Sequence, residues 1–185
     1  MNHRQQAKLY YLYMMSDGDI SDNEKRLFGT ICKKLQLDAD DKKHIMAECK
    51  EITDQEGLNC IQVIRKNAKE PHIFGALDIG LTGYASDKDK AVILWNLINL
   101  GYSDALFSSQ EKETVDFLRE YWQIPEFLYS EMMDVAETCL ALERHKQWVD
   151  TLPETEDKLK KLDQIKKDIK FTQETIETTI SEIAF

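Results

Sequence analysis

The chain has 185 residues, of which 42% are apolar and 31% are charged, and its formal net charge is −10. This length allows one substantial hydrophobic core, with or without an appendage. The negative charge argues against a general nucleic-acid-binding surface, because phosphate binding needs a positive field. Seven Gly and three Pro are few, and together with abundant Leu, Ile, Lys and Glu they favour helix over sheet.

The cysteines show no C-x-x-C spacing, and no secretory signal precedes them; they are Cys32, Cys49, Cys60 and Cys139. We therefore expect free thiols in a cytoplasmic protein, each buried as a small apolar side chain. No apolar run approaches the roughly 20 residues of a membrane span, so the sequence predicts a protein that is not transmembrane.

The first predicted helix runs from about residue 3 to Ser16. It is apolar on all sides over residues 9–15, which is typical of a buried helix. An acidic turn follows, and a second helix runs from Ser21 to about Leu35. Ser21 and Glu24 have the spacing of a capping box, in which each side chain bonds the other residue's backbone amide.

The next part of the first half contains two further helices. Asp38 is a suitable N-cap for a third helix, and Thr53 or Asp54 is the expected start of a fourth. Pro71 ends that run. The glycine-containing segment 73–83 is the weakest predicted helix, and we take it as the midpoint between two halves.

The second half repeats the pattern of the first. Ser86 begins a helix that ends near Gly101, with Asp89 in the capping-box position. An Asp, a Ser and a Glu then recur at a constant offset of 87 residues: Asp17, Ser21 and Glu24 correspond to Asp104, Ser108 and Glu111. We infer an internal duplication, with repeats at about residues 3–68 and 86–147.

The last third contains two long helices. Pro125 suits the first turn of one of them. The apolar residues of this helix are spaced alternately by four and three positions, which predicts that it packs lengthwise against neighbouring helices. A break is expected at 148–153. Residues 151–185 then form an amphipathic or coiled-coil helix, with a stripe from Leu159 to Ile183, that either crosses the body or pairs with a partner helix. The predicted fold is an all-α compact helical bundle of seven to eight helices at 1–150, plus this C-terminal helix.

The sequence Asp-Gly-Asp-Ile-Ser at 17–21, followed by Glu24, resembles the TerB-like (tellurite-resistance protein B) family, over residues 3–145. The resemblance implies an all-helical bundle with an internal repeat and a role in tellurite resistance, wider chemical stress or phage defence. It also implies membrane-associated or metal-handling partners and no well-defined catalytic activity.

The resemblance further implies a divalent cation, Ca²⁺ or Mg²⁺, at the acidic turn. The implied ligands are Asp17, Asp19 and Glu24 in the first turn, with Asp104 and Glu111 in the second. Ala105 and Leu106 replace Gly18 and Asp19 there, which puts a second site in doubt.

Two interpretations of the first turn stay open. Three carboxylates within eight residues suit a hard cation, but not an EF-hand, because Asp22 and Phe28 stand where that loop needs Gly and Glu. Alternatively, Asp17 and Asp19 solvate a turn while Glu24 caps the helix and interacts with its dipole.

The sequence contains no G-x-S-x-G, H-E-x-x-H or phosphate-loop motif, so we expect no enzyme. The lysines at 158–170 alternate with acids and predict a solvated, salt-bridged face. We expect a non-enzymatic binding module with a protein partner, at the C-terminal helix or the inter-repeat groove. The alternative is a structural assembly subunit, a homo-oligomer formed through that helix.

Overall fold

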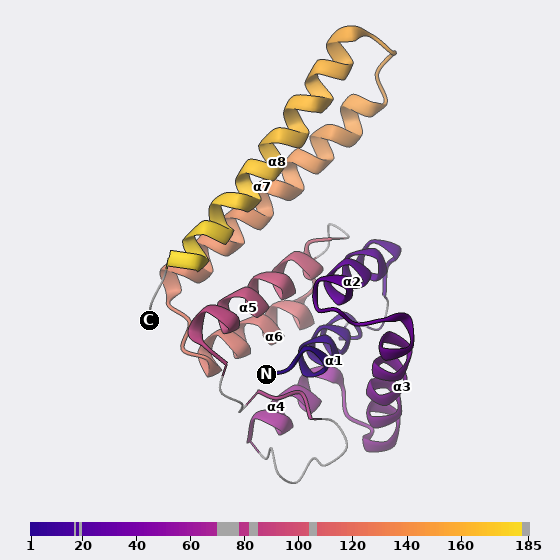
Figure 1. Cartoon of the computed structure of the whole chain (residues 1–185), viewed down its shortest axis with the longest axis vertical. Helices are drawn as coiled ribbons and strands as arrows, with labels where there is room; N and C mark the ends of the chain where they lie inside the picture. The colour runs from indigo at the N-terminus through magenta and orange to yellow at the C-terminus, as the bar shows by residue number, and fades with distance from the viewer. Residues whose placement is uncertain (17, 19, 70–77, 82–84, 104–106, 183–185) are drawn as a thin grey trace.

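A computed structural model describes residues 1–185 except 17, 19, 70–77, 82–84, 104–106 and 183–185, and the side chains of residues 55 and 56. The described residues form helices and no strand, which confirms the all-α prediction (Figure 1). The helices are α1 (His3–Met14), α2 (Asp22–Lys34), α3 (Ala39–Glu56), α4 (Cys60–Lys69), α5 (Asp87–Gly101), α6 (Ser109–Tyr121), α7 (Glu126–Asp150) and α8 (Glu156–Glu182).

Two inner helices organise the body. α1 contacts each of α2 to α6, and α5 contacts α1, α2, α6, α7 and α8. Both are buried on several sides, as their lack of a polar face predicts. Five aromatic side chains lie in the core and are at most 8% exposed: Tyr10, Tyr11, Tyr13, Trp95 and Trp122. The four cysteines are also free and buried.

Helices α7 and α8 form an antiparallel hairpin that projects from the body (Figure 1). The base of α8 joins the main core through Ile176 and Ile180. The hairpin turn falls between Asp150 and Glu156, where the break was expected. In this structure the C-terminal helix therefore lies against its own chain.

The order of helices repeats at the predicted offset of 87 residues. α1, α2 and α3 correspond to α5, α6 and α7. Ser21 and Ser108, which cap α2 and α6, both complete a capping box. Gln36 and Gln123 follow the two helices with left-handed φ angles of 58° and 56°. These glutamines are 87 residues apart, so the repetition extends to the backbone.

The same capping motif ends both α2 and α6. The Leu37 amide donates to the Cys32 carbonyl at 3.0 Å, and the Ile124 amide donates to the Arg119 carbonyl at 2.9 Å. With the left-handed residue between, this is a Schellman motif, which satisfies carbonyls that a helix end leaves unpaired. A left-handed glutamine costs about 1 kcal/mol, so its recurrence supports a duplicated structural unit.

The predicted start of the fourth helix at Thr53 or Asp54 is wrong. The Thr53 hydroxyl donates to the carbonyls of Cys49 and Lys50, an arrangement compatible with a helix interior. α3 continues until Gly57, whose φ of 60° ends it. Residues 78–81, the described part of the predicted helix 73–83, are not helical, and the remainder lies outside the described residues.

Substitution of Gly101 by Ala should destabilise the fold despite the better helix propensity of Ala. A Cβ atom at this position would lie 2.5 and 2.6 Å from ring carbons of Phe107 and would also collide with the Tyr13 hydroxyl. Helix propensity favours Ala by about 1 kcal/mol, whereas overpacking costs about 1–3 kcal/mol. We expect a net loss of about 1 kcal/mol in urea unfolding; a gain would contradict the close approach of these side chains.

Candidate binding cleft between the repeats

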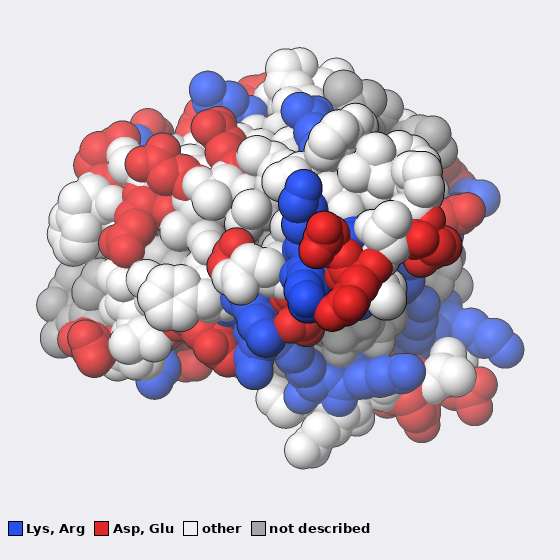
Figure 2. Space-filling model, turned by 90° about the horizontal axis from the view of Figure 1, so that it is seen from above, with Lys and Arg blue, Asp and Glu red and all other residues white. Residues whose placement is uncertain are grey.

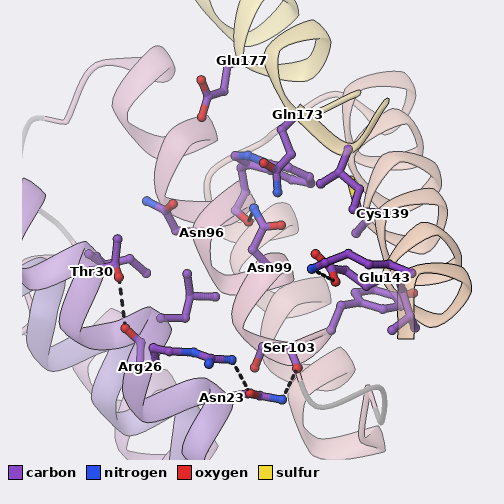
Figure 3. Close-up of a pocket in the computed structure, with 18 of the residues that line it drawn as sticks. Asn23, Arg26, Thr30, Asn96, Asn99, Ser103, Cys139, Glu143, Gln173 and Glu177 are labelled. Atoms are coloured by element: carbon purple, nitrogen blue, oxygen red, sulfur yellow. Dashed lines mark hydrogen bonds and ion pairs between the residues drawn. The ribbon is translucent and has the colours of Figure 1, made fainter. Parts of the chain in front are cut away.

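A cleft of about 870 Å³ lies between α2, α5 and the α7–α8 hairpin (Figure 3). Its volume lies within the range of typical ligand pockets. α2 comes from the first repeat, and α5 and α7 come from the second. The cleft therefore coincides with the inter-repeat groove considered in the sequence analysis, with α8 added as a further wall.

The base of the cleft combines buried apolar side chains with two amides. Ile31, Trp95 and Ala136 line it and are at most 5% exposed. Asn96 and Asn99 project into it from α5 (Figure 3). Most of the other side chains that line the cleft are polar or charged, so the apolar base forms only part of the surface that a ligand would meet.

Hydrogen bonds hold both amides in place. Asn96 Nδ2 donates to the Tyr10 hydroxyl at 3.1 Å, and Asn99 Nδ2 donates to the Trp95 carbonyl at 3.1 Å. Burial raises the pKa of Tyr10 far above its usual value, so this hydroxyl stays neutral. Each NH₂ group keeps a second N–H beside the one it donates, so each amide can both accept a hydrogen bond from a ligand and donate one to it.

Polar contacts join α2 to the end of α5 at one side of the cleft (Figure 3). Asn23 Nδ2 donates to the Ser103 carbonyl at 3.1 Å, and the Arg26 guanidinium donates to Asn23 Oδ1 at 2.6 Å. Nearby, Tyr102 donates to Glu137 at 3.0 Å. Burial, followed by this contact, raises the pKa of Tyr102 to about 12. The bond between Asn23 and Ser103 therefore links α2 to the end of α5, and the bond between Tyr102 and Glu137 links that end to α7.

The charged side chains of the cleft are unevenly paired. On α7, Lys146 forms an ion pair with Glu143 at 2.8 Å. On α2, Arg26 and Lys34 lie eight residues apart, on one face of the helix. Within the described part of the chain, neither has a carboxylate within ion-pair distance. The α2 wall is therefore positive, whereas α7 lines the cleft with basic and acidic side chains together, Arg144 and Lys146 beside Glu143.

The predicted cation ligands lie only partly within the described residues. Asp17, Asp19 and Asp104 fall outside them. Glu24 and Glu111 are 2% and 3% exposed. Each accepts the backbone amide of its capping serine, at 2.7 and 2.8 Å. Among described side chains, no group of three His, Cys, Asp or Glu could hold a metal ion.

The lysines of α8 form the predicted salt-bridged face. Lys160, Lys167 and Lys170 pair with acids one turn away, at 2.7, 2.7 and 3.5 Å. In the view along the hairpin, basic side chains gather near the centre, beside acidic ones (Figure 2). The apolar stripe predicted on this helix, from Leu159 to Ile183, is wrong at its first residue, because the Leu159 side chain is 60% exposed. Its last residue, Ile183, lies outside the described residues.

Lys158 ties together the turn of the hairpin, and its replacement by Met should loosen that turn. Its buried ammonium donates to the carbonyls of Asp150 and Leu152 at 2.9 and 3.0 Å, and to Glu154 at 2.6 Å. Hydrogen bonds to a charged donor contribute about 1.5–3 kcal/mol each. We expect at least about tenfold faster amide exchange over residues 146–160. The exposed Lys161→Met is the control; equal exchange in both variants would contradict this role.

Comparison of the chain with protein-family models, curated proteins and solved structures finds no match. The TerB-like resemblance therefore stays a prediction. Within the residues that the structure describes, no helix is both long and apolar enough to cross a membrane.

The sequence analysis anticipated an inter-repeat groove but not the residues that line it. Two signals were present. Asn96 and Asn99 interrupt the apolar run from Ala91 to Leu100, and Arg26, Thr30 and Lys34 recur every four residues on one helix. Because a polar residue in an apolar run is also compatible with a core hydrogen bond, only the fold separates the two interpretations.

Proposed function

We propose that this protein is a non-enzymatic binding module that recognises its partner through the cleft between α2, α5 and the α7–α8 hairpin. The observation that supports this most is the composition of the cleft, in which buried apolar residues are combined with fixed amides and a positive wall. The sequence resemblance adds the proposed setting: a TerB-like cytoplasmic response to tellurite, chemical stress or phage, at or near a membrane complex.

Selection from a displayed random-peptide library tests this function. Peptides of about 16 residues allow roughly four helical turns. The library is selected on the native 185-residue chain and counter-selected on Thr30→Trp, since Thr30 is an exposed residue of the cleft wall. Lys33→Trp, an exposed change on α2 outside the cleft, is the control. We expect peptides that bind the native protein and Lys33→Trp but not Thr30→Trp. Failure to recover them would overturn the proposal.

The acidic turn is a proposed Ca²⁺ or Mg²⁺ site in the same protein. Calorimetric titration of Ca²⁺, Mg²⁺ and Mn²⁺ into the native protein, Asp17→Asn and the control Asp22→Asn tests it. Asp22 is exposed and lies outside the implied ligand set. Saturable heat that only Asp17→Asn removes would support the site; no saturable heat would exclude it.

The rival function is a structural subunit that assembles through the hairpin. The observation in its favour is that Trp148, Leu159 and Phe171 are 58%, 60% and 72% exposed. Light scattering of the native protein and of Trp148→Glu/Phe171→Glu tests it. Substitution is preferable to removal of α8, because Ile176 and Ile180 belong to the core. An oligomer that the double variant dissociates would support assembly, whereas a native monomer would exclude it.

A further inference from the structure

The positive wall of the cleft indicates the chemistry of its ligand. Arg26 and Lys34 lie eight residues apart on α2, which corresponds to about 12 Å along a helix. Thr30 lies between them on the same face and also lines the cleft. Neither residue has a carboxylate partner among the described residues; because other exposed lysines share this property, it is their place on the cleft wall, in a chain of net charge −10, that indicates a ligand.

The remaining charges of the cleft are mixed in sign: Arg144 and Lys146 lie on α7, Glu143 lies beside them, and Glu177 lies on α8 (Figure 3). Glu143 is paired with Lys146, whereas Glu177 would repel a continuous phosphate backbone that ran along α8. Charges separated by more than about 8 Å are largely screened at physiological salt. A ligand with a few discrete carboxylates can therefore meet the α2 wall while it avoids the glutamates opposite.

The base of the cleft favours a peptide over a small anion. Leu27, Leu140 and Ile169 also line the cleft and are only partly buried, so they offer apolar surface to a ligand. Asn96 and Asn99 offer amide oxygens that accept hydrogen bonds from donors such as peptide N–H groups or side-chain amides. A segment with carboxylates on one side and apolar side chains beneath matches this arrangement. Amphipathic helices bind grooves between helices in this manner.

We propose that the cleft binds an acidic amphipathic segment of a partner protein, with carboxylates on Arg26 and Lys34 and apolar side chains over the partly exposed apolar residues that line the cleft. This rests on the proposed function and specifies its ligand. The affinity comes from apolar burial, and the two basic residues select acidic sequences, because exposed ion pairs contribute only about 0.2–1 kcal/mol each.

Three fluorescein-labelled synthetic peptides of equal length test the proposal by anisotropy. They share their leucine positions and carry Glu, Gln or Lys at the polar positions. We expect the Glu peptide to bind at least about tenfold more tightly than the Lys peptide. Arg26→Glu/Lys34→Glu should weaken its binding by about tenfold or more. Lys25→Glu/Lys33→Glu, the same charge change on residues of α2 that do not line the cleft, should keep it within about twofold.

The other outcomes separate this proposal from the proposed function. Equal binding of all three peptides, abolished by Thr30→Trp, would overturn the acidic preference and leave cleft binding intact. Binding that the two double variants reduce equally would also overturn it. A labelled single-stranded oligonucleotide that binds through Arg26 and Lys34, with no binding of the Glu peptide, would overturn the peptide assignment. If no peptide binds, the proposal fails, and the library selection decides the function independently.

Discussion

Ile45→Ala and Met132→Ala should each lower the free energy of unfolding by about 3 kcal/mol. Both side chains are fully buried, and they occupy equivalent positions on α3 and α7, 87 residues apart. Replacement of a buried Ile or Met by Ala typically costs about 2–5 kcal/mol, because it removes apolar contacts and leaves a cavity. Urea unfolding measures the loss, and the melting temperature should fall by about 6–12 °C.

Exposed positions beside these residues supply the controls. Lys43→Ala and Ser130→Ala are also equivalent positions on α3 and α7, and both are exposed. Each should change stability by less than about 0.5 kcal/mol. A large effect at Ile45 and none at Met132 would show that α3 and α7 do not hold equivalent places in the core.

Glu24→Ala and Glu111→Ala should each destabilise the protein by about 2 kcal/mol. Each carboxylate is almost fully buried and accepts the backbone amide of its N-cap serine. Loss of a cap contact costs about 1 kcal/mol, and an amide left without a partner costs about 1–3 kcal/mol. Thermal unfolding of the two variants should give losses that agree within about 1 kcal/mol.

Asp22→Ala and Ser109→Ala, at the first residues of α2 and α6, provide the comparison. Asp22 has a side chain that is 99% exposed, and it forms an exposed ion pair with Lys25 at 3.2 Å. These changes should cost less than about 0.5 kcal/mol. Glutamate variants that behave like them would contradict the buried caps.

Local features predicted most of the fold. The capping-box pattern predicted where α2, α5 and α6 begin, because a Ser and an acid three residues later accept hydrogen bonds from backbone amides within a single turn. Completely apolar runs gave the two inner helices. The boundary between α3 and α4 was missed because Thr53 is compatible with a cap and with a helix interior, and Gly57, which ends α3, was not recognised as the signal.

The candidate cleft depends on tertiary structure and was less predictable. The stripe of α8 did not determine whether that helix packs on its own chain, because an amphipathic face fits either partner. Only the folded chain brings Gln173 and Glu177 of α8 opposite Arg26 and Thr30 of α2. The charge pattern of α2 alone resembles an ordinary solvated face.

The library selection with Thr30→Trp as counter-target tests most directly whether this duplicated bundle is a cleft-binding module. Our account predicts peptides whose binding disappears when Trp occupies the cleft and persists when Trp stands at Lys33 on the neighbouring face. Peptides that bind all three proteins equally would show that recognition lies elsewhere on the surface, and would contradict the account.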